Sequence, residues 1–299
     1  MENREKMKSI LLELLDQFVQ VCESNGLQYY LAAGSVLGAV RHKGIIPWDD
    51  DIDVYLSRED YEKIQLLPQS VWGKSMRLAT WRNTKKYRYH FLKVESTTTT
   101  LIEQFDPIYV GGVYLDIFPL DSIPDDIELA QKQAADIRKC FDKYYILNAT
   151  NPQKCPSFYH YLKYRIKHCL YTIQHIQNKW ENVASRYTNS EKIADFHSEG
   201  YENPMYSKWF GQGKMMEFEG KMYKVPSDTD AYLRFMYGDY MTPPPLKDRI
   251  GHDSYLYVNF DRRISGAELK KVLSLVEEAT AYQFDCKKEW VYIKHKLHL

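Results

Sequence analysis

The hydrophobic pattern along the chain alternates between the period of helices and the period of strands. Residues 5–24 place their apolar side chains on one stripe, which predicts an amphipathic helix packed on a sheet. Residues 27–33 predict a strand that ends at Gly34, and a short helix is expected from Ser35. Residues 51–56 alternate polar and apolar side chains, as a half-buried strand does. A helix, a strand, a second helix and a second strand therefore follow one another at the start of the chain.

The later part of the chain continues this mixture of helices and strands. Ser57, followed three residues later by Asp60, resembles a capping box and predicts a helix start. The pattern predicts helices over residues 58–67, 124–145, 228–237 and 266–281 and strands over residues 90–94, 97–103, 112–118 and 221–225. The last ten residues suit an edge strand or a frayed end equally well. This order predicts an α+β fold with a mixed sheet.

Changes in composition divide the chain into three parts. We expect a core over residues 1–140, a helical insertion over residues 141–200 and a C-terminal α/β elaboration over residues 201–299 that completes the same compact unit. The insertion is basic and aromatic, because no acidic residue occurs between Lys143 and Trp180. A helix over residues 157–179 could lie on an anionic membrane or near a lipid-linked acceptor. The alternative is a helix packed on the core, with its lysine stems covering apolar surface.

Charge and cysteine content exclude some classes of protein. The chain has 40 basic and 40 acidic residues, and its zero net charge argues against a general nucleic-acid binder. Its five cysteines are scattered and form no CxxC pair, which predicts reduced thiols and neither a zinc site nor a disulfide framework. The charged start is unlike a secretory signal, and no run approaches the length of a membrane span. We therefore expect a cytoplasmic protein that is at most peripheral at the inner face of the membrane.

Four aspartates lie within five residues, in the segment Asp49-Asp50-Asp51-Ile52-Asp53. Residues two apart on a strand face the same side, so the carboxylates of Asp51 and Asp53 are expected to converge. Two carboxylates about 4 Å apart repel by roughly 1 kcal/mol in water and roughly 4 kcal/mol near a protein surface. A divalent cation relieves this repulsion, and oxygen ligands favour Mg²⁺ or Mn²⁺. The alternative for the aspartate run alone is a solvated turn.

The residues around this pair suit a bound phosphate. Gly34 lets the backbone approach a ligand closely, and Ser35 at the start of a helix suits a phosphate group. A phosphate facing metal-binding carboxylates indicates phosphoryl or nucleotidyl transfer. Such a site needs a third carboxylate, and Asp116 stands in an apolar, strand-prone run where an unpaired charge is costly. The alternative for Asp116 is a local cap or ion pair.

Three segments resemble the LicD family over about residues 10–255: AAGSVLGAVRHKGIIPWDDDIDVYL, YLDIFPLD and the later FEG…VP…YLRFMYGDYMTPPP. The resemblance implies a polymerase-β-type nucleotidyltransferase core in which Gly34-Ser35 is the GS element. It also implies that Asp51 and Asp53 are the paired metal ligands and that Asp116 is the third carboxylate. Members of the family transfer phosphocholine, or ribitol phosphate in fukutin-type relatives, onto glycans. The resemblance implies CDP-choline as the commonest donor and CMP as the leaving group.

Further side chains near the carboxylates are candidates for binding the donor. Arg41 could hold a donor phosphate through two hydrogen bonds, and Trp48 could stack on a base or on choline. Lys93 could neutralise a phosphate, while Arg249 and His252 are weaker candidates and His42 suits a local hydrogen bond better than catalysis. The alternatives are a surface position for Arg41 and Lys93 and burial beneath the loop for Trp48.

We therefore expect a metal-dependent phosphotransferase. It moves phosphocholine, or a similar phospho-alditol, from a CDP-linked donor to a hydroxyl of a glycan or lipid-linked glycan of the cell surface. Asp116 is the best candidate to accept the hydroxyl proton, and attack at the β-phosphorus follows from the resemblance alone. The main alternative is a nucleotide-sugar glycosyltransferase, against which Gly34-Ser35 and Asp116 argue. A non-catalytic nucleotide-binding module is the second alternative, and the three carboxylates argue against it.

Overall fold

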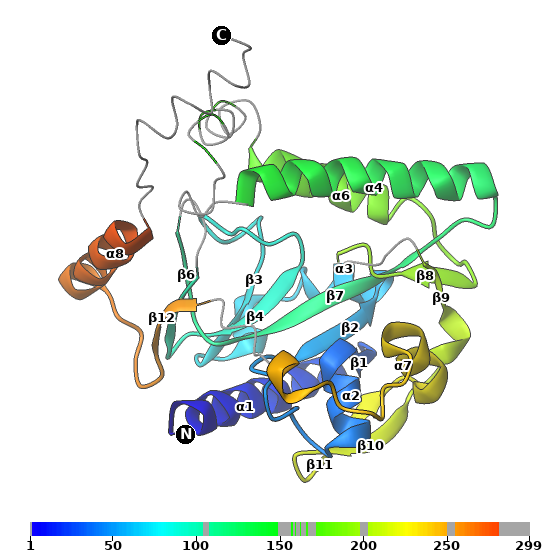
Figure 1. Ribbon diagram of the computed structural model, residues 1–299, viewed down its shortest axis with the longest axis horizontal. Helices are drawn as coiled ribbons and strands as arrows, with labels where there is room; N and C mark the ends of the chain where they lie inside the picture. Colours follow the sequence, from blue (N-terminus) through cyan, green and yellow to red (C-terminus); the bar gives the residue numbers. More distant parts are fainter. Residues whose placement is uncertain are drawn as a thin grey trace.

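The protein has a mixed α/β fold built around a curled, mixed sheet (Figure 1). The computed structural model describes residues 2–103, 108–148, 157, 159, 162, 166, 172–197, 203–249 and 255–280. Among the helices in these ranges, none combines the length and the apolar run needed to cross a bilayer. The basic side chains Lys163, Arg165 and Lys167 of the predicted membrane-facing helix lie outside the described residues, as do the last ten residues.

The central sheet has the strand order β1-β2-β7-β4-β3. Strands β2 and β7 run parallel, and their other neighbours in this order pair antiparallel. The strands are β1 (Tyr29–Leu31), β2 (Asp53–Ser57), β7 (Tyr114–Ser122), β4 (Leu92–Ser96) and β3 (Met76–Ala79), with β8 (Lys192–Ala194) and β9 (Met205–Tyr206) added beside the end of β7. The middle strands are almost continuously buried, because helices cover both faces of the sheet.

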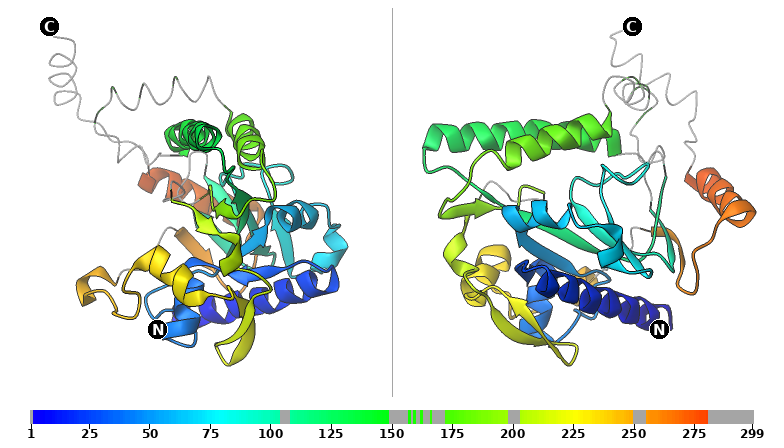
Figure 2. Two further views of the ribbon diagram at one scale, coloured as in Figure 1. Left: turned by 90° about the vertical axis from the view of Figure 1, so that its right-hand side faces the viewer. Right: turned by 180° about the vertical axis from the view of Figure 1, so that it is seen from behind.

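Helices lie on both sides of this sheet, as the views in Figures 1 and 2 agree. Helix α1 (Glu2–Ser24) packs against β4 and β7 through its apolar stripe, so the predicted amphipathic helix is confirmed. Helices α4 (Ile127–Asn148) and α6 (Ile173–Ala184) pack together on the opposite side. Their contact forms a second apolar cluster around Phe141 and Trp180. The central sheet therefore lies between α1 on one side and the α4–α6 pair on the other.

Smaller elements surround this core. They are α2 (Ala33–Arg41), α3 (Arg58–Ile64), the hairpin of β10 (Lys214–Phe218) and β11 (Lys221–Val225), α7 (Thr229–Tyr237), α8 (Gly266–Thr280) and a sheet of β12 (Tyr255–Asn259), β5 (Thr100–Glu103) and β6 (Tyr109–Gly111). Short 3₁₀ turns occupy Gln69–Trp72, Ser207–Trp209 and Leu246–Asp248. Figure 1 shows α2, α7 and the β10–β11 hairpin grouped at one end of the sheet.

Local capping chemistry places several helix ends where the sequence predicts them. The Ser57 side chain accepts a hydrogen bond from the Asp60 N–H, which confirms the predicted start of α3. Asp228 caps α7 in the same way, and Gly238 ends that helix with a φ of 64°. Helix α3 stops at Ile64, so the predicted end of this helix is too late.

The first strand and the strand of the aspartates are shorter than predicted. Strand β1 stops at Leu31, and α2 begins at Ala33, two residues before the predicted start at Ser35. Strand β2 begins at Asp53, so Asp51 stands just before it, but the predicted alternation holds there because Ile52 is buried between the half-buried Asp51 and Asp53 and its carbonyl accepts a hydrogen bond from the Asp116 N–H at 3.1 Å. Strands β3, β6, β8, β9, β10 and β12 were not predicted.

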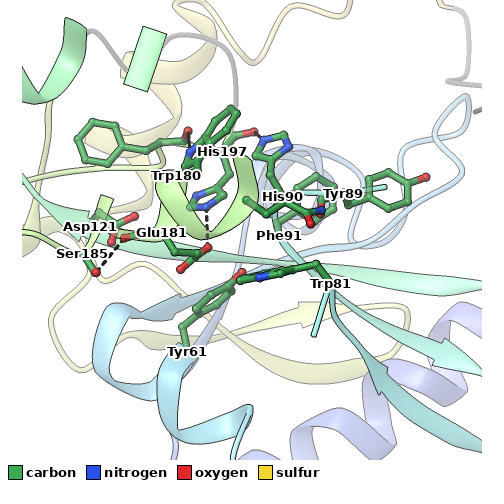
Figure 3. A network of polar contacts seen from close by, with 12 residues as sticks. Tyr61, Trp81, Tyr89, His90, Phe91, Asp121, Trp180, Glu181, Ser185 and His197 are labelled. Atoms are coloured by element: carbon green, nitrogen blue, oxygen red, sulfur yellow. Dashed lines mark hydrogen bonds and ion pairs between the residues drawn. The ribbon is translucent and has the colours of Figure 1, made fainter. Parts of the chain in front are cut away.

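Buried charges connect the α4–α6 layer to the sheet. Arg58 donates to both carboxylate oxygens of Asp121 at 2.5 and 2.8 Å, and to Glu181 of α6 at 2.5 Å. The second oxygen of Glu181 lies 3.2 Å from Nε2 of His197, and Figure 3 shows this ring directed at the carboxylate. Arg58, Asp121 and Glu181 are all buried. We call these four side chains the Arg58 network.

Candidate active site

The central strands bring three chemically important side chains into one row. Asp53 of β2 pairs with Asp116 of β7 in the parallel register, and Lys93 of β4 pairs with the same Asp116 in the antiparallel register. Neighbouring strands lie about 4.8 Å apart, so side chains on one face of such a row are within contact distance. Lys93 Nζ donates to Asp116 Oδ1 at 2.7 Å. The sheet register therefore assembles the site from segments that are far apart in the sequence.

Asp51 joins this row from the segment directly before β2. One carboxylate oxygen from each of Asp51, Asp53 and Asp116 lies within 4.8 Å of the others. Asp49, Asp50 and Asp51 form a second group with the same spacing, so Asp51 belongs to both. The structure thus brings together the three carboxylates that the sequence singles out.

The carboxylates carry an electrostatic cost that a cation would relieve. Burial raises the pKa of Asp53 well above its ordinary value, and the charges of Asp51 and Asp116 raise it further. Burial also raises the pKa of Asp116, although the Lys93 ammonium opposes this change. Carboxylate oxygens are the ligands that hard divalent cations prefer. The residues present therefore suit Mg²⁺ or Mn²⁺.

The turn from β1 into α2 is tied to the strand of the aspartates. Ser35 Oγ accepts a hydrogen bond from the Asp53 N–H at 3.0 Å, so its hydroxyl holds the first residue of β2. The Tyr232 hydroxyl accepts a hydrogen bond from the Ala33 N–H at 2.9 Å. A Cβ atom on Gly34 would lie 2.7 Å from Oδ2 of Asp49, so the absence of a side chain at Gly34 leaves room for this carboxylate.

A cleft of about 570 Å³ opens above the carboxylates. Asp49, Asp51 and Asp53 line it together with Gly34 and residues from α2, the loop after α2, the end of α7 and the segment that follows α7: Arg41, Ile46, Trp48, Tyr237, Asp239, Tyr240, Thr242 and Pro244. This volume lies within the range of about 300–1,000 Å³ that is typical of small-molecule and cofactor sites.

Two arginines flank the indole ring of Trp48 at the edge of the cleft. The guanidinium carbon of Arg249 lies 4.9 Å from the ring centroid of Trp48, and that of Arg41 lies 5.9 Å from it. Arg41 also donates to the Tyr240 carbonyl at 2.7 Å. Burial lowers the pKa of Arg41, and the like charge of Arg249 lowers it further. An anion between these side chains would relieve that repulsion.

Three further candidates from the sequence are Lys93, His42 and His252, and Lys93, unlike Arg41, does not face the cleft. Lys93 is fully buried, with its ammonium 2.9 Å from the ring centroid of Tyr114 and 3.9 Å from that of Tyr89. It therefore lies behind Asp116 instead of facing the cleft. His42 stands edge-on to Trp48, and its pKa is lowered by burial and by Arg41 and Arg249. His252 lies outside the described residues.

Sequence reasoning missed the side of the cleft that α7 and the following segment provide. Tyr237, Tyr240 and Thr242 line the cleft, and burial raises the pKa of Tyr237 above its ordinary range, with the carboxylates adding to this effect. The only signal was the YLRFMYGDYMTPPP block, whose place in space cannot be read from its own pattern.

Comparison with known proteins finds a family domain in the first half of the chain. The family described as LicD/FKTN/FKRP, nucleotidyltransferase domain, matches residues 26–148, which include the three carboxylates and Lys93. The lipopolysaccharide cholinephosphotransferase LicD of Haemophilus influenzae is 26% identical over 270 residues, which cover 81% of this chain and 93% of that protein.

Two shorter matches come from other organisms. The ribitol 5-phosphate transferase FKRP of Mus musculus is 48% identical over 50 residues, which are 17% of this chain and 10% of that protein. An uncharacterized protein of Rickettsia typhi is 41% identical over 66 residues, which are 22% of this chain and 21% of that protein. The chain thus carries a LicD family domain, and over most of its length it is similar to the LicD cholinephosphotransferase of Haemophilus influenzae.

Proposed function

We propose that this protein is a metal-dependent phosphotransferase with a nucleotidyltransferase-type core. It moves phosphocholine, or a similar phospho-alcohol, from a CDP-linked donor to a hydroxyl of a glycan and releases CMP. The observation that carries the proposal is the cluster of Asp51, Asp53 and Asp116, two of which, Asp51 and Asp53, line a cleft of about 570 Å³. The transferases among the relatives support the reaction class, because their names record the transfer of phosphocholine and of ribitol phosphate.

The three carboxylates are the residues that would hold Mg²⁺ or Mn²⁺. A bound divalent cation would neutralise charge on the donor's diphosphate and on the acceptor oxygen. The backbone at Gly34 and the guanidinium of Arg41 face the same cleft and suit the phosphates. The rings of Trp48 and Tyr237 line it as well and suit a base or a quaternary ammonium head group.

Asp116 is the candidate general base. Its Oδ1 atom accepts a hydrogen bond from Lys93, which fixes the orientation of the carboxylate. In the proposed reaction the acceptor oxygen forms a bond to the β-phosphorus while the bond between that phosphorus and the oxygen of CMP breaks. The hydroxyl proton passes to Asp116 and from there to solvent. Lys93 acts in this proposal as a positioning residue that keeps one carboxylate oxygen occupied and the other directed to the site.

The proposal is tested by offering the protein several donors with Mg²⁺ and a glycan acceptor preparation. Labelled CDP-choline, CDP-ribitol and a set of UDP-sugars are incubated separately, and released CMP or UDP is measured. We expect CMP from a CDP-linked donor and no UDP above the background of a heat-treated sample. Release of UDP from a UDP-sugar would instead identify a glycosyltransferase. Binding of the nucleotides without release of either product would identify a non-catalytic module.

A further inference from the structure

The loop between α2 and β2 carries Asp49 and Asp51, so the geometry of the acidic group depends on what holds this loop. Each loop residue loses about 1–2 kcal/mol of backbone entropy when it is fixed, so an ordered loop needs compensating contacts. The loop begins at His42, whose N–H bonds to the Gly38 carbonyl at 2.8 Å. It ends at Asp53, which is held by Ser35. Neither contact fixes the middle of the loop.

The Gly44 N–H also donates to the Gly38 carbonyl at 3.3 Å and Ile46 is buried in the core, and Glu219 adds contacts to the middle of the loop from the tip of the β10–β11 hairpin. Its Oε1 atom accepts a hydrogen bond from the Ile45 N–H at 2.9 Å, and its own N–H donates to the Lys43 carbonyl at 2.8 Å. Its Oε2 atom forms an ion pair with Lys8 Nζ of α1 at 2.7 Å. The Glu219 side chain is only 18% exposed. One residue therefore connects the hairpin, the loop and the first helix.

Glycines allow this close approach. A Cβ atom on Gly44 would lie 2.1 Å from Glu219 Oε1, so any side chain there would displace the carboxylate. A Cβ atom on Gly38 would lie 2.4 Å from the Gly44 carbonyl oxygen and 3.4 Å from the ring of Phe218. The absence of a side chain at Gly44 thus lets the Glu219 carboxylate approach the loop, and the absence of one at Gly38 lets the Gly44 carbonyl approach α2.

Turn chemistry does not account for a glutamate at this position. Glu219 and Gly220 form the two-residue connection of the hairpin, with φ values of 53° and 75°. Such turns favour asparagine, aspartate or glycine at the first position, because those residues tolerate a positive φ best. A longer side chain at this position therefore costs conformational energy, and its contacts with the loop offset that cost.

We propose that Glu219 is a positioning residue for the metal site. It holds Lys43 to Ile45 in place, so that Asp49 and Asp51 already face Asp53 and Asp116 before a cation binds. The inference rests on the metal site of the proposed function and adds to it a residue that touches neither the metal nor the donor. It also assigns a physical role to the FEG segment at residues 218–220.

The test measures Mn²⁺ binding by calorimetry in the absence of donor, together with thermal unfolding. We expect Glu219→Ala to weaken Mn²⁺ binding by about tenfold, the size typical of residues that orient metal ligands from outside the coordination shell. Glu219→Gln keeps a carbonyl oxygen that can accept from Ile45 and should restore binding to within about threefold of the wild type. Lys8→Met removes only a partly exposed ion pair and is the matched control, with an expected change of less than about fivefold.

The outcomes separate a positioning role from a structural one. Wild-type Mn²⁺ affinity in Glu219→Ala, with or without a lower melting temperature, would overturn the positioning role while leaving the metal site intact. Should Glu219→Ala not fold, Glu219→Asp keeps the charge but shortens the reach to Ile45, and wild-type affinity in that variant overturns the role equally. Absence of Mn²⁺ binding by the wild type would overturn the metal site and this role together, and the CMP-release assay would show whether the transferase activity also fails.

Discussion

The ionised form of Asp53 is destabilised by burial and by the neighbouring carboxylates. Its carboxylate is held beside those of Asp51 and Asp116, and burial together with these charges raises its pKa well above the ordinary value. A protein gains nothing in stability from this arrangement, because like charges at such distances repel. The arrangement is explained if the group that binds there is positively charged. The cost at the residue scale is therefore itself a sign of function.

Replacing Asp53 by asparagine separates the functional role of this carboxylate from its structural role. We expect Asp53→Asn to lower the rate of CMP release by about three decades or more, since loss of a metal ligand removes several kcal/mol of transition-state stabilisation. The melting temperature measured in EDTA should stay level or rise, because the repulsion is relieved. A variant that keeps a tenth of the wild-type rate would contradict the assignment of Asp53.

The raised pKa of Asp53 also predicts how the metal-free protein responds to pH. A carboxyl group whose folded-state pKa is raised stabilises the fold fully below its unfolded value, 3.8, and loses this contribution as pH rises through the folded-state pKa. Asparagine cannot ionise, so the melting temperature of Asp53→Asn should exceed that of the wild type by an amount that grows with pH. Thermal unfolding in EDTA from about pH 5 to about pH 8 measures this. The exposed Glu62, changed to glutamine, is the control, and a constant difference across this range would contradict the prediction.

At the scale of elements, the register of three strands decides which charges meet. Strand β4 places Lys93 opposite Asp116, and strand β2 places Asp53 on the other side of the same residue. The Lys93 ammonium is fully buried between aromatic rings and pairs with Asp116. A buried charge without its partner is strongly destabilising, so the pair is interdependent. The antiparallel pairing of β4 with β7 therefore places a positive charge beside Asp116, and this charge opposes the rise that burial causes in the pKa of Asp116.

Removing the lysine tests this interdependence. We expect Lys93→Met to lower the free energy of unfolding by about 3 kcal/mol at neutral pH, because Asp116 is left buried and unpaired. Adding Asp116→Asn to this variant should recover part of the loss without restoring CMP release. Urea unfolding in EDTA measures both effects, with Lys63→Met, whose ion pair is exposed, as a control that changes stability by about 0.5 kcal/mol. A double variant no more stable than Lys93→Met would contradict the pairing.

At the scale of the whole molecule, the Arg58 network fastens the α4–α6 layer to the sheet. Arg58 of α3 contacts Asp121 at the far end of β7 and Glu181 of α6, so three elements meet in one buried group. Burial opposes the charge of Glu181, but Arg58 and His197 outweigh it and lower the pKa of Glu181 to about 2. Asp121 follows Asp116 by five residues along β7, which separates the two by about 17 Å. The network therefore concerns assembly and not catalysis.

Removing Arg58 should accordingly affect stability and spare chemistry. We expect Arg58→Met to lower the free energy of unfolding by about 3–5 kcal/mol, since two buried carboxylates lose their partner. Well below its melting temperature, the variant should release CMP at nearly the wild-type rate. The matched control is Arg234→Met, whose pair with Asp230 is exposed on both sides and should cost less than about 1 kcal/mol. A stability loss of that small size in Arg58→Met would contradict the role of the network.

The sequence by itself determined the features that depend on neighbours along the chain. The run from Asp49 to Asp53, the strand-to-helix junction near Gly34-Ser35 and the caps of α3 and α7 are recognisable because capping and turn chemistry act within a few residues. The stripe of α1 was also readable, since an amphipathic helix shows its buried face in its own spacing. Strands of two or three residues, such as β8 and β9, are too short to show a period and were missed.

Only the tertiary structure decided which of these features meet. The sequence nominated Asp116, but the parallel pairing of β7 with β2 is what puts it beside Asp53. From the sequence pattern, Lys93 could either face solvent or neutralise a phosphate. In the structure the sheet buries it, and it forms an ion pair with Asp116. Nothing local indicated that Glu219 would reach the loop of the aspartates. Burial and pairing of this kind arise from contacts between segments far apart in the chain, and those contacts leave no periodic signal in the sequence.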